Sequence, residues 1–100
     1  MWENVKPSRN TVILSLSYED FATIQVEKRM RNNGMIEYEI SFHIEDVHDS
    51  IISCFKLEDV EKILKVSKSL IENLYDEIDG MDDIEIDEWI EDFEDQVNDF

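Results

Sequence analysis

Residues 22–45, ATIQVEKRMRNNGMIEYEISFHIE, decide the fold of this chain. Apolar and polar residues alternate on both sides of Asn32, Asn33 and Gly34, which is the pattern of two antiparallel strands joined by a tight turn. Placing Arg31 opposite Met35 brings the apolar residues of both strands onto one face, in the pairs Met30–Ile36, Val26–Ile40, Ile24–Phe42 and Ala22–Ile44. A shift by one residue would place apolar residues opposite polar ones, so this register is favoured.

The opposite face of this hairpin is charged. Arg29 lies opposite Glu37 in the same register, and we expect these two side chains to form a favourable cross-strand pair. The cluster Lys28, Arg29 and Arg31 is the only basic patch in the sequence, and the glutamates around it predict that it balances the charge of the sheet itself.

Outward from the hairpin, further short segments read as strands. The sequence predicts an antiparallel sheet of three to four strands, at about 11–17, 22–31, 35–45 and 50–56, preceded by an irregular lead-in at 1–10. One alternative for the second segment stays open, because Ser17 and Asp20 have the spacing of a capping box at the start of a helix. The alternation at positions 22, 24 and 26 favours a strand.

Two helices are predicted after the sheet. Apolar residues recur every three to four positions from Leu57 to Ile78, which indicates a helix over about 58–79, and Gly80 lies where a C-terminal helix cap is expected. A second helix over about 82–99 carries one apolar stripe, formed by Ile86, Trp89, Ile90, Phe93, Val97 and Phe100. The order predicts a single α+β domain over residues 1–100, with the helices on one face of the sheet.

The charge of the chain is concentrated at its C-terminal end. The sequence has 26 acidic and 9 basic residues, a net charge of −17. All nine basic residues lie between Lys6 and Lys68, so residues 71–100, with fourteen acids and no base, carry −14, and residues 1–70 carry 9 − 12 = −3. Self-repulsion of one-sign charge destabilises a compact state, so we infer that this charge serves a partner rather than the fold.

Composition also limits the classes of function. The start of the chain lacks the apolar core of a signal peptide, no apolar run is long enough to span a membrane, and Cys54 is the only cysteine. A reducing, cytoplasmic setting is therefore expected. A charge of −17 predicts repulsion from nucleic acids and anionic membranes and attraction to basic protein surfaces.

The predicted partner-binding surface is the acidic helix. Its candidate residues are Asp82, Asp83, Glu85, Asp87, Glu88, Glu91, Asp92, Glu94, Asp95 and Asp99, and Asp76, Glu77 and Asp79 extend the surface around the turn before it. Eighteen helical residues span about 27 Å, so these ten carboxylates give about one charge per 2.7 Å of axis. Duplex DNA carries one per about 1.7 Å, or about 3.4 Å along one strand. Such a lattice fits a groove that holds a phosphate backbone.

The apolar stripe distinguishes this segment from a disordered tail. Trp89, Phe93 and Phe100 at helical spacing predict that the helix is anchored and that its carboxylates are held outward in a fixed pattern. Two other interpretations stay open. The charges form a solvated face that serves solubility, or the stripe itself is the binding surface and the segment folds into the groove of a partner.

No catalytic, cofactor or metal site is assigned from the sequence. In residues 76–88, a glycine at loop position six of an EF-hand would place Ile86 where a carboxylate is required. His43 and His48 are expected to be surface histidines, and Cys54 lies in an apolar run and is expected to be a buried small hydrophobe. Paired carboxylates are so frequent here that no pair indicates acid–base catalysis.

Taken together, a short, strongly acidic chain with one small sheet and the terminal segment IEIDEWIEDFEDQVNDF (residues 84–100) resembles, as a class, the small acidic inhibitors encoded by phages: DNA-mimic and anti-CRISPR proteins. The resemblance rests on residues 71–100 and on pattern, and no family motif assigns a residue. It implies a non-enzymatic inhibitor without cofactors in the host cytoplasm. That inhibitor blocks the basic channel of a nucleic-acid-binding protein such as a host-defence nuclease or CRISPR effector, and binds no nucleic acid directly.

Two rival functions stay open. The first is an immunity protein or antitoxin that caps a toxin nuclease, and the second is a regulatory or assembly module that uses the apolar stripe. The sequence leaves open whether the chain forms a homodimer.

Overall fold

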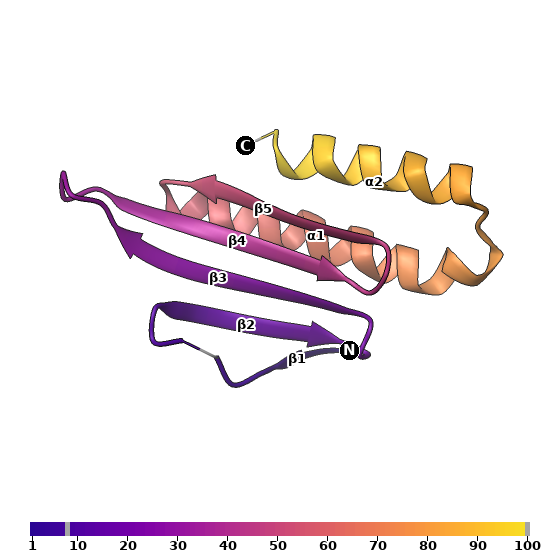
Figure 1. Cartoon of the computed structure of the whole chain (residues 1–100), viewed down its shortest axis with the longest axis horizontal. Coiled ribbons are helices and arrows are strands. Elements are labelled where there is room, and N and C mark those ends of the chain that lie inside the picture. Colours follow the sequence, from indigo (N-terminus) through magenta and orange to yellow (C-terminus); the bar gives the residue numbers. More distant parts are fainter. Residues whose placement is uncertain (8, 100) are drawn as a thin grey trace. The chain divides into compact units, whose positions relative to one another are not determined.

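The computed structural model describes residues 1–7 and 9–99 and has an α+β fold (Figure 1). Its strands and helices, in chain order, are β1 (Trp2–Asn4), β2 (Val12–Tyr18), β3 (Ala22–Met30), β4 (Ile36–Ile44), β5 (His48–Cys54), α1 (Leu57–Glu77), the 3₁₀ turn η1 (Ile78–Gly80) and α2 (Asp83–Val97). The chain divides into two compact units, unit 1 (Met1–Val60) and unit 2 (Glu61–Phe100). The expectation of a single domain stays a prediction.

Unit 1 contains an antiparallel sheet in which every strand pairs with its neighbours in sequence, in the order β1-β2-β3-β4-β5. The predicted register of the β3–β4 hairpin is confirmed at all four apolar pairs, from Met30–Ile36 to Ala22–Ile44. Gly34 supplies the left-handed conformation that the turn needs, with φ of 85°.

The sheet has five strands rather than three to four. The predicted irregular lead-in contains β1, which pairs Trp2 with Tyr18 and Asn4 with Leu16. The Trp2 and Tyr18 rings lie 5.0 Å apart between centroids, and Val5 N donates to Ser15 O at 2.9 Å. Three residues are too few to show a strand period, so only tertiary pairing reveals β1.

The connection between β2 and β3 is a turn, so the alternative of a helix start at Ser17 is wrong. Phe21 N donates to Tyr18 O at 2.8 Å, and Glu19 and Asp20 adopt left-handed conformations with φ of 51° and 56°. The non-local pairing of Ser17 with Thr23 and of Tyr18 with Ala22 outweighs the local capping signal.

Alternation along β3 and β4 produces one apolar face. Ala22, Ile24 and Val26 on β3 and Ile40, Phe42 and Ile44 on β4 are at most 2% exposed. Burying one such larger side chain contributes about 1.5–3 kcal/mol, so the burial of this face stabilises the fold strongly.

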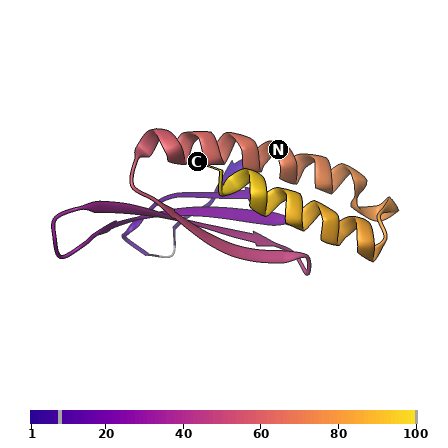
Figure 2. The same cartoon turned by 90° about the horizontal axis from the view of Figure 1, so that it is seen from above.

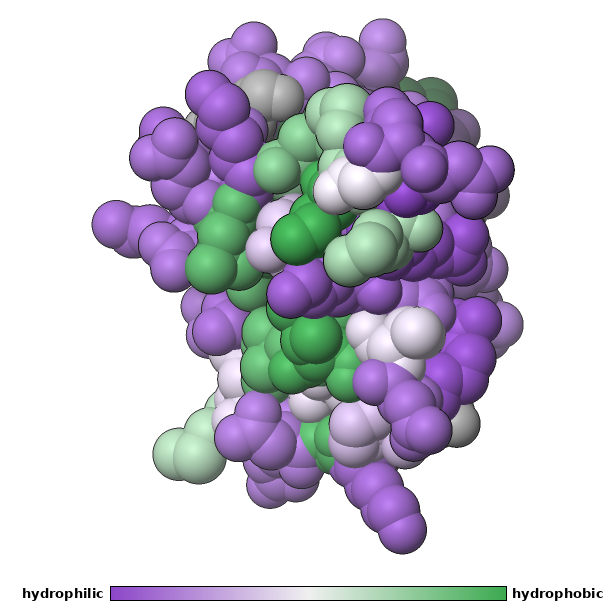
Figure 3. All heavy atoms as spheres, turned by 90° about the vertical axis from the view of Figure 1, so that its left-hand side faces the viewer, coloured by the Kyte–Doolittle hydropathy of each residue, from purple (hydrophilic) through white to green (hydrophobic). Residues whose placement is uncertain are grey.

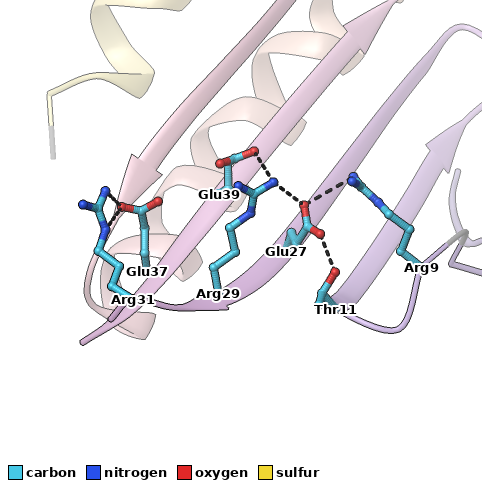
Figure 4. Close-up of polar contacts among 7 residues, drawn as sticks. All are labelled: Arg9, Thr11, Glu27, Arg29, Arg31, Glu37 and Glu39. Carbon is cyan, nitrogen blue, oxygen red and sulfur yellow. Dashed lines mark hydrogen bonds and ion pairs between the residues drawn. The ribbon is translucent and has the colours of Figure 1, made fainter. Parts of the chain in front are cut away.

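The other face carries a charged network (Figure 4). Glu27, which is 7% exposed, accepts a hydrogen bond from Thr11 Oγ1 and forms ion pairs with Arg9 at 3.3 Å and Arg29 at 3.4 Å. Arg29 also pairs with Glu39 at 3.6 Å. The hydrogen bond from Thr11, followed by the charges of Arg9 and Arg29, holds the pKa of Glu27 below its ordinary value.

Arg29 and Glu37 are partners in the register, as predicted, but no ion pair joins them among the described residues. Glu37 instead accepts from Arg31, whose Nε lies 2.8 Å from Glu37 Oε2, and Arg29 lies between Glu27 and Glu39. Long arginine side chains reach diagonal neighbours as easily as direct ones, so a register does not fix which carboxylate each one contacts.

Exposed apolar side chains occur at the hairpin end of the sheet. Met30 is 74% exposed and Met35 47% exposed, and Phe55 lies half exposed with the Arg31 guanidinium 5.8 Å from its ring centroid. Figure 3 looks onto this end of the sheet and shows apolar side chains among hydrophilic ones.

Unit 2 consists of antiparallel helices, with η1 between them (Figure 2). The predicted apolar period of α1 is confirmed, because Ile63, Ile71 and Leu74 are at most 2% exposed. Ser67 on the same stripe is fully buried and donates to Leu64 O at 3.1 Å. The helix ends at Glu77 and tightens into η1, so Gly80 belongs to this 3₁₀ turn and not to a left-handed cap.

The Glu27 network predicts a specific loss of stability in acid. Because the folded-state pKa of Glu27 is lowered, its stabilising contribution is present above the unfolded-state pKa and is lost as pH falls through the folded-state pKa. Urea unfolding from pH 7 to pH 3 should therefore show a falling stability difference between the wild type and Glu27→Gln. A constant difference would contradict this account, and Glu3→Gln, at an exposed site, is the matched control.

Candidate protein-binding surface

The start of α2 is capped by its own sequence. Asp82 has an extended backbone, and its Oδ1 accepts from Glu85 N at 2.8 Å, while its carbonyl accepts from Ile86 N at 3.0 Å. Asp83 and Glu85 place negative charge in the first turn, where the helix dipole favours it. Three of the candidate carboxylates therefore also help to begin the helix.

The other end of α2 is closed by Asn98. Its backbone N donates to Glu94 O at 3.1 Å as the last i→i−4 bond of the helix, and its Nδ2 donates to the same oxygen at 2.8 Å. The last turn contains acids and no base, an arrangement that the helix dipole disfavours. The acids in the last turn therefore interact unfavourably with the helix dipole.

The predicted apolar stripe is present, and its C-terminal half is buried. Phe93 is fully buried, Val97 is 2% exposed, and the Trp89 ring stacks on Phe93 with centroids 5.0 Å apart. Ile86, Trp89 and Ile90 are half-buried, and Phe100 lies outside the described residues. Phe93 and Val97 are therefore buried within the chain, so little of the stripe remains for a partner to contact.

All thirteen predicted partner-binding carboxylates are exposed. They comprise the ten acids from Asp82 to Asp99 on and around α2 and Asp76, Glu77 and Asp79 before it. Glu94 aside, none of the thirteen forms an ion pair within residues 1–7 and 9–99. The two side-chain hydrogen bonds at Asp82 and Asp92 come from Glu85 N and from Gln96 Nε2 at 2.9 Å. The surface is therefore negative and almost uncompensated.

The carboxylates of α2 fall into two rows. At about 100° per residue, the acids occupy roughly 200° of the helix circumference, centred opposite Phe93. Row A contains Asp83, Asp87, Glu91 and Glu94, and row B contains Glu85, Glu88, Asp92 and Asp95. Within a row the rise between neighbours averages about 5 Å. The rows lie on average about 10 Å apart across the helix and approach each other at Glu91 and Asp95, which are i,i+4 neighbours.

This arrangement resembles the two sides of a nucleic-acid groove in scale. One DNA strand places a phosphate every 3.4 Å or so along the axis, and the major groove is about 12 Å wide. Each row therefore has about two thirds of the charge density of one strand. A basic cleft shaped for a duplex would receive both rows together from the side opposite Phe93.

Holding these charges costs stability. Four like-charged pairs are spaced i,i+4, namely 83–87, 87–91, 88–92 and 91–95, and each such pair destabilises a helix by about 0.2–0.5 kcal/mol. Together they cost about 1–2 kcal/mol, which the buried Phe93 and Val97 offset. The acids therefore lower the stability of α2 rather than raise it.

Ile84 is a residue that the sequence analysis did not single out. It is 70% exposed and lies between the two carboxylate rows, on the side of the helix opposite Phe93. The signal was present in the sequence, because Ile84 is out of phase with the apolar stripe. An exposed apolar side chain within a charged surface is the kind of residue that anchors an interface.

The other candidate sites offer little chemistry. His43 is exposed and pairs with Asp49 through Nδ1, and the His48 side chain is half-buried. Cys54 is buried, and burial together with the charge of Asp59 raises the pKa of its thiol, so it is a poor nucleophile at neutral pH. Among residues 1–7 and 9–99, no group of three or more His, Cys, Asp or Glu is arranged to hold a metal ion.

No helix within the described part of the chain is long and apolar enough to cross a membrane. No family model, curated protein or solved structure matches the chain. The candidate surface therefore rests on its own geometry.

The anchoring of α2 is testable by two substitutions on opposite sides of the helix. Phe93→Ala removes a fully buried ring and should lower the free energy of unfolding by about 3–5 kcal/mol. Ile84→Ala, at an exposed site, should change it by less than about 0.5 kcal/mol. Urea unfolding followed by circular dichroism measures both, and equal effects would show that α2 is not held through Phe93.

Proposed function

We propose that this protein is a non-enzymatic inhibitor whose helix α2 imitates the phosphate backbone of a nucleic acid. In this proposal α2 enters the basic channel of a nucleic-acid-binding enzyme and blocks it. The target class is a host-defence nuclease, so the inhibitor is of the anti-CRISPR or anti-restriction type. The observation that carries the proposal is the pair of exposed carboxylate rows on a helix whose opposite side is buried at Phe93 and Val97.

The distribution of charge supports this function over a role in solubility. Unit 1 carries six bases and eleven acids, a net of −5, whereas unit 2 carries three bases and fifteen acids, a net of −12. All three arginines lie in unit 1 and are paired with glutamates. Acids that serve only solubility need not be concentrated on one helix. Lysines in the last turn of α2 would also reduce its unfavourable interaction with the helix dipole, and α2 has none there.

The mechanism would be competitive. Long-range attraction would speed the encounter between the acidic rows and a basic cleft, and this effect would weaken as salt rises. One exposed ion pair contributes only about 0–1 kcal/mol, so affinity requires many pairs formed together. Ile84 would add an apolar contact between the rows, where the ion pairs around it exclude water.

The immunity-protein and antitoxin alternative would use the same acidic surface to cap a toxin nuclease. The assembly-module alternative needs the apolar stripe to be free. Since Phe93 and Val97 are buried within the chain, that alternative retains only Ile86, Trp89 and Ile90, which are half-buried.

Neutralising the centre of the two rows tests the proposal. The variant changes Asp87, Glu88, Glu91, Asp92, Glu94 and Asp95 to Asn or Gln. At about 0.5 kcal/mol for each lost ion pair, binding should weaken by about 3 kcal/mol, or roughly 100-fold. The measurement is inhibition of DNA cleavage across a panel of RNA-guided and restriction nucleases.

The matched control removes the same number of charges from exposed positions in unit 1, at Glu3, Glu19, Asp20, Glu45, Asp46 and Glu58. Both variants have a net charge of −17 + 6 = −11, so general charge cannot explain a difference between them. The control should inhibit within about threefold of the wild type. The proposal fails if both variants lose inhibition equally, or if the wild type inhibits no nuclease of the panel.

Salt gives a second test that needs no prior choice of target. The immobilised wild type should retain a basic nucleic-acid-binding protein from a lysate of the native host and release it in a rising NaCl gradient. The neutralised α2 variant should not retain that protein. A partner that is retained by both proteins, or that stays bound at high salt, would contradict the proposal.

A further inference from the structure

The two edges of the sheet in unit 1 are unlike one another. β1 at one edge has three residues, and very short edge strands are one way in which proteins prevent edge-to-edge pairing. β5 at the other edge has seven residues in unbroken register with β4, from Tyr38–Cys54 to Ile44–His48. Within the described residues β5 pairs with β4 alone, so its outer backbone groups have no strand partner.

The sequence of β5 also lacks residues that protect an edge. It contains no proline, no lysine and no bulge, and residues 50–55, SIISCF, have no charged side chain. Such a run of high strand propensity and low charge favours pairing with another strand. In a chain with 35% charged residues this neutrality is local, since residues 47–57 contain only Asp49 and Lys56 and have no net charge.

We propose that β5 is a dimerisation edge, and that a second copy of this chain pairs with it in antiparallel fashion. The seven residues are centred on Ile51, so a two-fold axis at Ile51 pairs all of them, from His48 with Cys54 of the second copy inward. Asp49 then lies opposite Ser53, and no like charges meet. The five-stranded sheets of the two copies join into one continuous sheet.

The second copy is the occupant that the charge pattern favours. Two chains of −17 repel each other over most of their surfaces, whereas residues 47–57, which include β5, have no net charge and so oppose pairing only weakly. Ile51 is 64% exposed on the outer face of the edge strand. In the proposed register it is covered by Ile51 of the second copy, and cross-strand contacts between β-branched residues stabilise such pairs.

This inference depends on the strand order and on β5, and not on the function proposed for α2. The two interactions also respond oppositely to salt. Dimerisation brings two acidic chains together, so screening should strengthen it, whereas binding of α2 to a basic channel should weaken in salt. A failure of one proposal is therefore recognisable without affecting the other.

Sedimentation velocity of the full chain tests the proposal. We expect reversible association from the 11.9 kDa monomer to a species of twice that mass as concentration rises to about 1 mM, and a lower dissociation constant in 1 M than in 0.1 M NaCl. A wild type that remains monomeric at both salt concentrations would overturn the proposal.

Two lysine substitutions locate the interface. Ile51→Lys places like charges opposite each other at the dimer centre and should raise the dissociation constant at least about tenfold. Ile13→Lys is the matched control, because Ile13 is 51% exposed but lies on β2 in the interior of the sheet. Far-ultraviolet circular dichroism establishes that both variants are folded. Equal weakening by the two variants would overturn the proposal.

Cross-linking tests the register without weakening the edge. In a Cys54→Ser background, Ile51→Cys places two thiols opposite each other at a separation that a disulfide can span after small adjustment. Mild oxidation should convert this variant to a covalent dimer at least about tenfold faster than Ile13→Cys in the same background. Equal rates would overturn the assignment of β5 as the interface.

Discussion

The burial of Phe93 and Val97 is the constraint on which the acidic surface depends. A helix whose i,i+4 neighbours repel one another, and whose last turn is acidic, is unfavourable by its local charges alone. Side-chain burial on one stripe, the Asp82 cap and the Asn98 closure make it stable. The same stripe then fixes the rotation of the helix, so the carboxylates point away from it in two rows.

In the sheet, by contrast, the buried charges are paired. Its buried glutamates each have arginine partners, Arg9 and Arg29 at Glu27 and Arg31 at Glu37, and no arginine occurs elsewhere in the chain. A guanidinium holds a carboxylate in a defined geometry, whereas the lysines of α1 are flexible point charges. The buried glutamates of unit 1 and their arginines therefore belong to its structure, and most of the charge in unit 2 stays available to solvent or to a partner.

Much of this architecture could be predicted from periodicity. The alternation around Gly34 gives the β3–β4 register pair by pair, and the spacing of Ile63, Ile71, Leu74, Phe93 and Val97 gives the buried stripes of both helices. The exposure of the acids on α2 follows from the same spacing. Such patterns are long enough for one interpretation to outweigh the others.

What was missed depends on tertiary contacts or on single residues. β1 is too short to have a period, and the partner of Arg29 is decided by side-chain reach rather than by register. Ile84 lies opposite the apolar stripe on α2 and so escapes a search for periodicity. That β5 is an edge strand is visible only after the strand order is known.

The most direct test of whether a folded helix holds the carboxylates is amide hydrogen exchange of the free protein. NMR follows this exchange residue by residue at neutral pH. The account predicts that the amides from Trp89 to Val97 exchange much more slowly than in an unstructured peptide, with protection approaching that of the β3 and β4 amides. Exchange of α2 at random-coil rates in an otherwise protected protein would mean that the carboxylates form a flexible tail, and the mimicry of a phosphate backbone by a fixed array would be wrong.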